Sequence, residues 1–156
     1  RVGTGAVRRD PETRAVRRGG ESVAWRGGGG ARVRKGEGGG GDAAYVAVAV
    51  LAGGGRAHLA APIPVEEVLP CAGQGISGVV MREDGRAEVR EALRLIDHDE
   101  TRAAATAERA FLGALDGSCR TPIAAHLFDR GDDWQLIGEV LALNGQQRWR
   151  ADGTCR

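Results

Sequence analysis

The sequence has few cysteines and few aromatic residues, and it has no long hydrophobic run. Its 156 residues include three cysteines, none at the Cys-x-x-Cys spacing of zinc and redox motifs. An odd set of three does not form a disulfide framework, which favours a reducing compartment. No apolar run approaches the roughly 18 residues of a membrane helix, and the first residues lack the pattern of a signal peptide. We therefore predict a cytoplasmic protein without a membrane partner.

Metal and phosphate sites also lack their usual signals. The three histidines, His58, His98 and His126, fall in different predicted elements without metal-ligand spacing, so no metal site is predicted. The Gly-Gln-Gly sequence at residues 73–75 lacks both the Gly-Lys-Ser/Thr ending of a phosphate loop and a GxGxxG pattern. We interpret it as part of a strand whose glycines let neighbouring backbones approach closely.

Positive charge is concentrated at the start of the chain. Residues 1–35 hold ten basic residues and three acidic ones, a net charge of +7, whereas residues 36–156 carry −6. Such an asymmetry indicates an anionic partner for the first segment: nucleic acid, phosphate or a polycarboxylate. Composition alone does not choose among these three.

Glycine is abundant in the same part of the chain, where 16 of the 26 glycines fall within the first 55 residues. By themselves such runs are typical of flexible linkers. Between them, however, the apolar run at residues 42–51 predicts a buried strand leading into a helix, and residues 22–25 predict a second strand. A helix is predicted at residues 9–18. The order strand, helix, strand is typical of an α/β fold.

Three prolines, Pro62, Pro64 and Pro70, indicate a boundary near residue 69. Beyond it, helical periodicity begins at about residue 86, and Asp97 or Asp99 could cap a second helix that stops at Gly117. We expect one face of this second helix to be covered by small and apolar residues: Ala103, Ala104, Ala107, Ala110, Phe111, Ala114 and Leu115. The remaining expected elements are a strand at 73–81, helices at 86–96 and 100–115, and strands at 123–128 and 134–143, with no terminal helix after 145.

Four separated segments carry recognisable motifs. Residues 1–9 (RVGTGAVRR) are similar to a GTSS-x-RR loop, and residues 25–35 (WRGGGGARVRK) to an RGN-x-x-TRL-x-KL stretch. Residues 69–75 (LPCAGQG) are similar to LPA-x-GQG, and residues 107–123 (AERAFLGALDGSCRTPI) to AERAFL followed by L-x-GGC-x-x-PI. In this order and over most of the chain, the motifs resemble the hydroxymethylbilane synthase family, also called porphobilinogen deaminase.

The resemblance implies a domain organisation. Residues 1–68 would form part of the family's second domain, an α/β domain like that of periplasmic binding proteins. Residues 69–82 would form a crossing strand or hinge, and residues 83–156 a small α+β domain of helices against a short antiparallel sheet, without its C-terminal helix. The family's first domain, with the aspartate on which the chemistry depends, would precede Arg1. No catalytic residue is therefore expected in this chain, and we expect an inactive fragment.

The resemblance also implies a function. The family condenses four porphobilinogen units with loss of ammonia, in tetrapyrrole biosynthesis, on a dipyrromethane cofactor bound to one cysteine. Cys119 matches that cysteine. Pyrrole acetates and propionates suit the planar fork of arginine, and the matching positions are Arg8, Arg9, Arg26 and Arg32. We expect these four to converge on a cleft facing Cys119 and to hold porphobilinogen and its polypyrrole chain, in a monomer without a nucleic-acid partner.

Several positions depart from the family motifs. Gly5 and Ala6 stand where the family has paired serines, and Gly28 replaces an asparagine. Ala31 replaces a threonine and Gly36 a leucine. Because loss of a buried leucine costs about 2–5 kcal/mol, weaker folding of the first half is expected.

Two other functions remain open at this point. Residues 26–35 could be a disordered Arg/Gly-rich segment that binds nucleic acid, although only Trp25 is available to stack on a base. Alternatively, the chain could be a carboxylate-binding module without catalysis.

Overall fold

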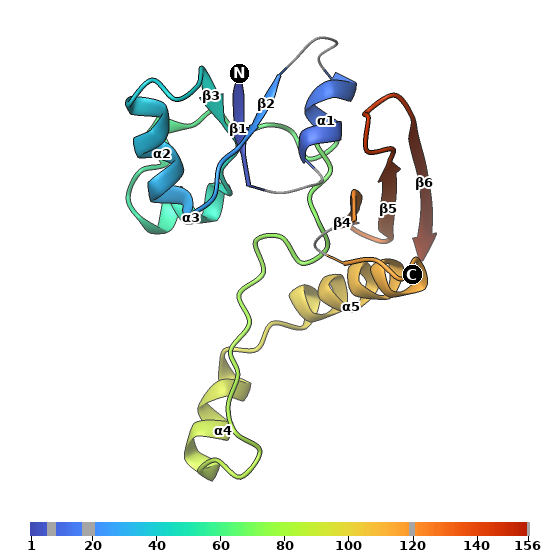
Figure 1. Cartoon of the computed structure of the whole chain (residues 1–156). Coiled ribbons are helices and arrows are strands. Elements are labelled where there is room, and N and C mark those ends of the chain that lie inside the picture. The colour runs from blue at the N-terminus through green and yellow to red at the C-terminus, as the bar shows by residue number, and fades with distance from the viewer. Residues whose placement is uncertain (6–8, 17–20, 119–120, 156) are drawn as a thin grey trace.

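The computed structural model describes residues 1–5, 9–16, 21–118 and 121–155, and it shows two small sheets with helices packed beside them (Figure 1). The first sheet is parallel, with strand order β2-β1-β3. Its strands are β1 (Val2–Thr4), β2 (Ser22–Ala24) and β3 (Ala43–Ala44). The accompanying helices are α1 (Arg9–Val16), α2 (Gly29–Glu37), α3 (Val48–Gly53) and the 3-10 turn η1 (Ala57–Leu59). The α/β character predicted for this half is confirmed.

Trp25 explains several glycines of the first half. Its side chain is buried, 5% exposed, at the end of β2. A Cβ on Gly3 would lie 2.3 Å from the indole ring, and Cβ atoms on Gly40 and Gly41 would each lie 3.2 Å from it. These glycines therefore make room for the indole, and their runs contribute to packing as well as to turns.

The second sheet is antiparallel, with strand order β4-β5-β6. Its strands are β4 (Ile123–Asp129), β5 (Trp134–Leu141) and β6 (Arg148–Cys155), and helix α5 (Asp99–Ala114) packs chiefly on β4. Its core contains a cluster of buried apolar residues: Leu69, Ala124, Phe128 and Ile137. This arrangement confirms a mixed fold with a short antiparallel sheet, against which α5 packs, whereas the likeness to periplasmic binding proteins stays a prediction.

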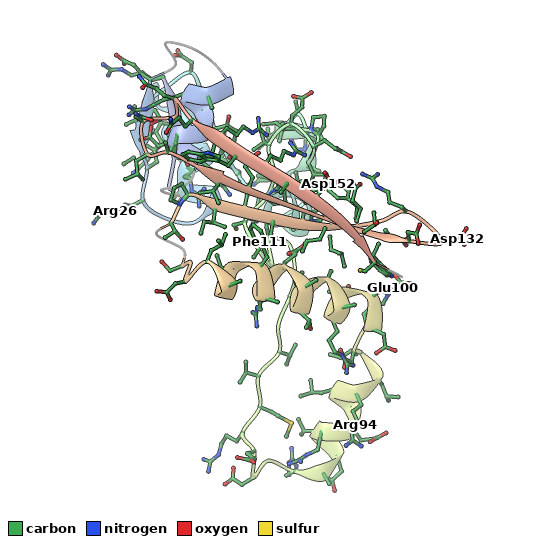
Figure 2. The ribbon with its side chains drawn as sticks, turned by 90° about the vertical axis from the view of Figure 1, so that its right-hand side faces the viewer. Arg26, Arg94, Glu100, Phe111, Asp132 and Asp152 are labelled. Carbon is green, nitrogen blue, oxygen red and sulfur yellow. The ribbon has the colours of Figure 1, made fainter. Side chains whose placement is uncertain are left out.

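Residues 69–75 are attached to the second half of the chain. Leu69 is fully buried in its core, and the Ala125 N–H donates to the Pro70 carbonyl at 3.1 Å. After this segment the chain leaves the body and returns through helix α4 (Ala87–Leu95), which projects away from both sheets (Figures 1 and 2).

The predicted strand at 73–81 is wrong. Residues 72–75 form a turn, and residues 76–80 belong to no helix or strand. A strand needs a partner for its backbone groups, and within the described part of the chain none lies alongside. Strand β6, conversely, was not predicted.

The ends and the buried face of α5 also differ from prediction. His98, not Asp97 or Asp99, is the N-cap, because its side chain accepts from the Thr101 N–H. At the other end Asp116, not Gly117, has a left-handed backbone, with φ 49°. The Gly117 N–H donates to the Leu112 carbonyl at 2.9 Å and the Asp116 N–H to the Gly113 carbonyl at 3.1 Å, a Schellman motif.

The face of α5 that is at least partly buried includes Thr101, Ala104, Glu108, Phe111 and Leu112. Of the small and apolar residues predicted to line it, Ala103, Ala110, Ala114 and Leu115 are instead exposed. In the described part of the chain, no helix combines the length and the apolar composition that crossing a membrane requires.

Candidate cofactor-binding site

The carboxyl ends of the three parallel strands meet at one edge of the first sheet. Thr4 ends β1, Ala24 ends β2 and Ala44 ends β3. In open α/β sheets this edge is where ligands bind. Of the arginines singled out from the sequence, Arg9 belongs to the segment that follows β1, and Arg26 and Arg32 belong to the segment that follows β2.

Two of these arginines meet at one backbone carbonyl. The Arg9 guanidinium donates to the Tyr45 carbonyl oxygen at 3.3 Å, and the Arg32 guanidinium donates to the same oxygen at 2.9 Å. Arg32 Nε also donates to the Gly27 carbonyl at 3.2 Å. A guanidinium has five N–H donors, so these bonds orient Arg32 and leave it further donors for a carboxylate.

Gly5 lies directly against this arginine pair. A Cβ on Gly5 would be 3.7 Å from the Arg32 guanidinium carbon and only 2.7 Å from the Trp25 carbonyl oxygen. A serine at this position would therefore require the backbone to shift. Gly5, which stands where the family motif has a serine, therefore fits the close approach of the Trp25 backbone found here.

Of the remaining predicted residues, only Arg26 is among the described ones, and it is not brought to this pair. Arg26 is exposed and extends away from the ribbon in Figure 2. Its carbonyl accepts from Lys35 Nζ at 3.5 Å. Arg8 and Cys119 lie outside the described residues. The convergence of all four arginines on Cys119 stays a prediction.

Ser118 and Thr121, the described residues on either side of the Cys119 segment, are hydrogen-bonded to each other. The Thr121 N–H donates to the Ser118 carbonyl at 3.0 Å, and the Ser118 N–H donates to Thr121 Oγ1 at 2.7 Å. Ser118 is exposed, whereas Ile123, where β4 begins, is buried. Cys119 thus lies in the sequence between the exposed end of α5 and a core strand.

Glu108 is a structural residue that the sequence interpretation missed. Its carboxylate is buried and accepts from the Gly73 N–H at 2.7 Å, the Leu127 N–H at 3.0 Å and His126 Nδ1 at 3.1 Å. Burial raises the pKa of Glu108, but the bonds from His126 and the two amides outweigh it, so the pKa lies below its ordinary value. The carboxylate fastens residues 69–75 to α5 and β4. The sequence did contain a signal for this structural role, because Glu108 is a charged residue between Ala104 and Phe111 on a partly buried helix face.

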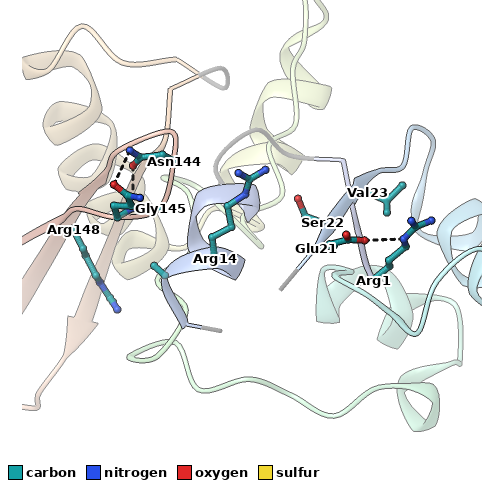
Figure 3. Close-up of a pocket in the computed structure, with 10 residues that line it drawn as sticks. Arg1, Arg14, Glu21, Ser22, Val23, Asn144, Gly145 and Arg148 are labelled. Carbon is teal, nitrogen blue, oxygen red and sulfur yellow. Dashed lines mark hydrogen bonds and ion pairs between the residues drawn. The ribbon is translucent and has the colours of Figure 1, made fainter. Parts of the chain in front are cut away.

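A cleft of about 1000 Å³ opens at the opposite edge of the first sheet (Figure 3). Its three arginines already have carboxylate partners, so the cleft offers little to an anionic ligand. The pairs are Arg1 with Glu21 at 2.9 Å, Arg14 with Asp10 at 3.1 Å, and Arg148 with Glu139 at 2.5 Å. Among the described residues, no group of three or more His, Cys, Asp or Glu side chains could hold a metal ion.

These features define an α/β module with two arginines that meet at the Tyr45 carbonyl, joined to a small α+β module. Residues 1–91 match the family model described as porphobilinogen deaminase, dipyrromethane cofactor binding domain. Residues 101–156 match the model described as porphobilinogen deaminase, C-terminal domain.

Individual relatives give the same result. The chain is 40% identical over 152 residues to the porphobilinogen deaminase of Nitratidesulfovibrio vulgaris strain Hildenborough, covering 94% of this chain and 47% of that protein. It is 40% identical over 147 residues to the one from Roseiflexus castenholzii, covering 94% and 48%. The chain belongs to the porphobilinogen deaminase family, and it spans about half the length of these relatives.

Proposed function

We propose that this chain is the part of a hydroxymethylbilane synthase that carries the dipyrromethane cofactor. In this proposal the complete enzyme is a transferase that condenses four porphobilinogen units with loss of ammonia, in tetrapyrrole biosynthesis. The observation that carries it is the meeting of Arg9 and Arg32 at the Tyr45 carbonyl, inside the segment matched by the cofactor-binding family model.

The chemistry of these residues fits the cofactor. Arg9 and Arg32, joined by Arg8 and Arg26, would hold the acetate and propionate groups through charge-assisted hydrogen bonds. The thiolate of Cys119 would form the thioether, because a thiolate is the nucleophilic form of cysteine. When bound, the cofactor supplies the primer to which substrate units are added.

The nucleic-acid interpretation has less support. Residues 29–37 form helix α2 and not a disordered segment, and Trp25 is buried and so does not present its ring to a base. A cytoplasmic monomer without a nucleic-acid or membrane partner remains part of the proposal.

The cofactor itself provides the test. Protein exposed to preformed hydroxymethylbilane and then freed of unbound pyrrole should turn coloured with Ehrlich's reagent, and peptide mass mapping should place the pyrrole adduct on Cys119. The exposed Cys71 and Cys155 provide internal controls. An adduct on either of these two would contradict the proposal, and so would the absence of any adduct.

The arginine pair has a matched control within one helix. Arg32→Ala should reduce cofactor loading, because it removes one of the two guanidinium groups at the Tyr45 carbonyl. Arg34→Ala, an exposed position of the same helix, should leave loading unchanged. If both substitutions reduced cofactor loading equally, loading would depend on general positive charge and not on a defined subsite.

A further inference from the structure

A second, smaller cleft lies between two helices of the first half. Helices α2 and α3 pack against each other beside the first sheet (Figure 1). The cleft between them has a volume of about 310 Å³, at the lower end of the roughly 300–1,000 Å³ of small-molecule sites. It is lined by Gly30, Val33, Val50, Leu51, Gly54 and Arg56. A cleft of this size suits a small molecule.

The spacing of the lining residues explains why the cleft exists. Gly30 and Val33 are three residues apart in α2 and therefore lie on one face of that helix. Val50 and Gly54, four residues apart at the end of α3, likewise share a face. The helices come close at one point, where a Cβ on Gly29 would lie 2.6 Å from Val50 Cγ1. Gly30 and Gly54 have no side chain to fill the space that remains.

Most of the cleft is apolar, and part of that surface reaches solvent. The Leu51 side chain is buried, 4% exposed, whereas Val50 is 52% exposed. Covering a half-exposed valine with a hydrocarbon group removes apolar surface from water, which is favourable. The cleft therefore favours a ligand with an apolar part.

Arg56 is the charged group of the cleft. Its backbone N–H donates to the Leu51 carbonyl at 2.7 Å, which fixes the residue at the end of α3. Its guanidinium forms no hydrogen bond or ion pair in the described part of the chain, and no carboxylate is among the described residues that line the cleft. In the larger cleft, by contrast, all three arginines have carboxylate partners. The Arg56 guanidinium is therefore available to an anionic group.

The α2–α3 cleft is separate from the arginine pair of the cofactor site. Arg32 and Val33 are consecutive in α2, and consecutive residues of a helix do not share a face. The Arg32 guanidinium donates to the Tyr45 carbonyl, whereas Val33 lines the cleft. A ligand of this cleft would therefore not occupy the place of the cofactor.

We propose that the α2–α3 cleft is a binding site for small monocarboxylates with an apolar chain. Arg56 binds the carboxylate through charge-assisted hydrogen bonds. Val33, Val50 and Leu51 contact the hydrocarbon chain. This site goes beyond the proposed function and does not depend on a cofactor being loaded.

Three small ligands test the two parts of the site. In NMR titrations of the isotope-labelled 156-residue chain, octanoate should bind with a Kd on the order of 1 mM, since so small a ligand gains limited binding free energy. Acetate has no hydrocarbon chain to bury and should bind at least about 10-fold more weakly. Octylammonium should not bind, because its positive charge would lie beside Arg56. The amide shifts should centre on residues 30–33 and 50–56.

The carboxylate contact has a matched control. Arg56 and Arg86 are both exposed, and neither guanidinium forms a hydrogen bond or ion pair in the described part of the chain, so Arg56→Gln and Arg86→Gln should both fold. Arg56→Gln should bind octanoate about 10-fold more weakly, because a charge-assisted hydrogen bond is lost. Arg86→Gln, whose charge is removed outside the cleft, should bind octanoate as the unmodified chain does.

Filling the cleft provides a second pair of variants. A Cβ on Gly30 meets only Arg34 Nη1, at 3.7 Å, and a Cβ on Gly36 meets no atom within 4 Å. Leucine at either position of α2 is therefore compatible with the helix, and it also has the better helix propensity. Because Gly30 lines the cleft and Gly36 does not, Gly30→Leu should abolish octanoate binding and Gly36→Leu should leave it unchanged.

The same measurements can overturn the inference. No saturable octanoate binding up to about 10 mM would show that the cleft is only a gap in helix packing. Shifts centred on α4 or on the second sheet would place the ligand elsewhere. Equal octanoate affinity of Gly30→Leu and Gly36→Leu, or of Arg56→Gln and Arg86→Gln, would also contradict the site, as would octylammonium binding as tightly as octanoate.

Discussion

At the scale of single residues, Glu108 is the buried charge with the clearest structural role. Its carboxylate accepts from two backbone amides and His126, and its pKa is lowered as a result. Folding therefore favours the ionised form. The stabilisation is complete above the unfolded-state pKa of about 4.3 and is lost as the pH falls through the lower folded-state pKa.

Replacing Glu108 with glutamine should reveal this dependence. At pH 7, Glu108→Gln should lower the free energy of unfolding by about 1–3 kcal/mol, because one acceptor becomes a donor facing buried N–H groups. The loss should shrink below pH 4, where the wild-type carboxylate becomes protonated. Urea unfolding at both pH values measures it, with the exposed Glu88→Gln as control. An equal loss at both pH values would show that charge is not responsible.

Gly138 is the second residue whose identity the packing determines. A Cβ at this position on β5 would lie 2.3 Å from a ring carbon of Phe111 on α5. We expect Gly138→Ala to lower the free energy of unfolding by about 1–3 kcal/mol, as overpacking does elsewhere. Gly153→Ala, in β6 with no atom within 4 Å, is the control and should be close to neutral. Similar values for both in denaturant titrations would contradict this packing.

At the scale of elements, α2 is weakened by its own glycines. Gly36 lies within the helix, and a Cβ there meets no atom within 4 Å. Gly36→Ala should therefore raise the free energy of unfolding by about 0.5–1 kcal/mol, the usual difference between the two residues in a helix. Gly39→Ala should instead be destabilising, because Gly39 has φ 75°. Thermal melts of the two variants should shift in opposite directions, and a downward shift for Gly36→Ala would refute the prediction.

Elements with strong local signals were predictable from sequence. Helix α5 was expected at 100–115 and found at Asp99–Ala114, because a long periodic segment specifies a helix locally. The expected strand at 73–81 is absent because a strand depends on a distant partner, and these residues have none in the part of the chain that the structure describes. Strand β6 was not expected, because its exposed residues show no apolar alternation.

The candidate site was predictable only in part. The resemblance selected Arg9 and Arg32, but the Tyr45 carbonyl that both contact is a backbone group, and no side-chain pattern identifies it. Glu108 was missed because its motif served only to carry the resemblance and the carboxylate was given no role, although a glutamate near Phe111 on a helix was visible in the sequence.

At the scale of the whole molecule, the two sheets belong to modules that touch at few points. Gly145, in the turn between β5 and β6, lies so close to α1 that a Cβ there would be 2.6 Å from the Pro11 carbonyl oxygen. Arg150 of β6 donates to the Glu66 carbonyl at 2.8 Å. The domain boundaries at 68 and 83 stay predictions, but residues 69–75 pack with the second half. Within the described part of the chain, residues 76–96 form only helix α4 and pair with neither sheet. The central claim of the proposed function is that this chain, which spans about half the length of its relatives, is the cofactor-carrying part of such an enzyme.

The rate of hydroxymethylbilane formation tests this central claim most directly. The resemblance places the family's acid-base carboxylate in a first domain that no motif of this chain matches, and such a group is typically worth ~100- to 10,000-fold in rate. The purified 156-residue chain should form product no faster than its Cys119→Ser variant, and the rate should rise when the complementary part of a relative is added. Product formation by the chain alone, well above the rate of the Cys119→Ser variant, would contradict the account.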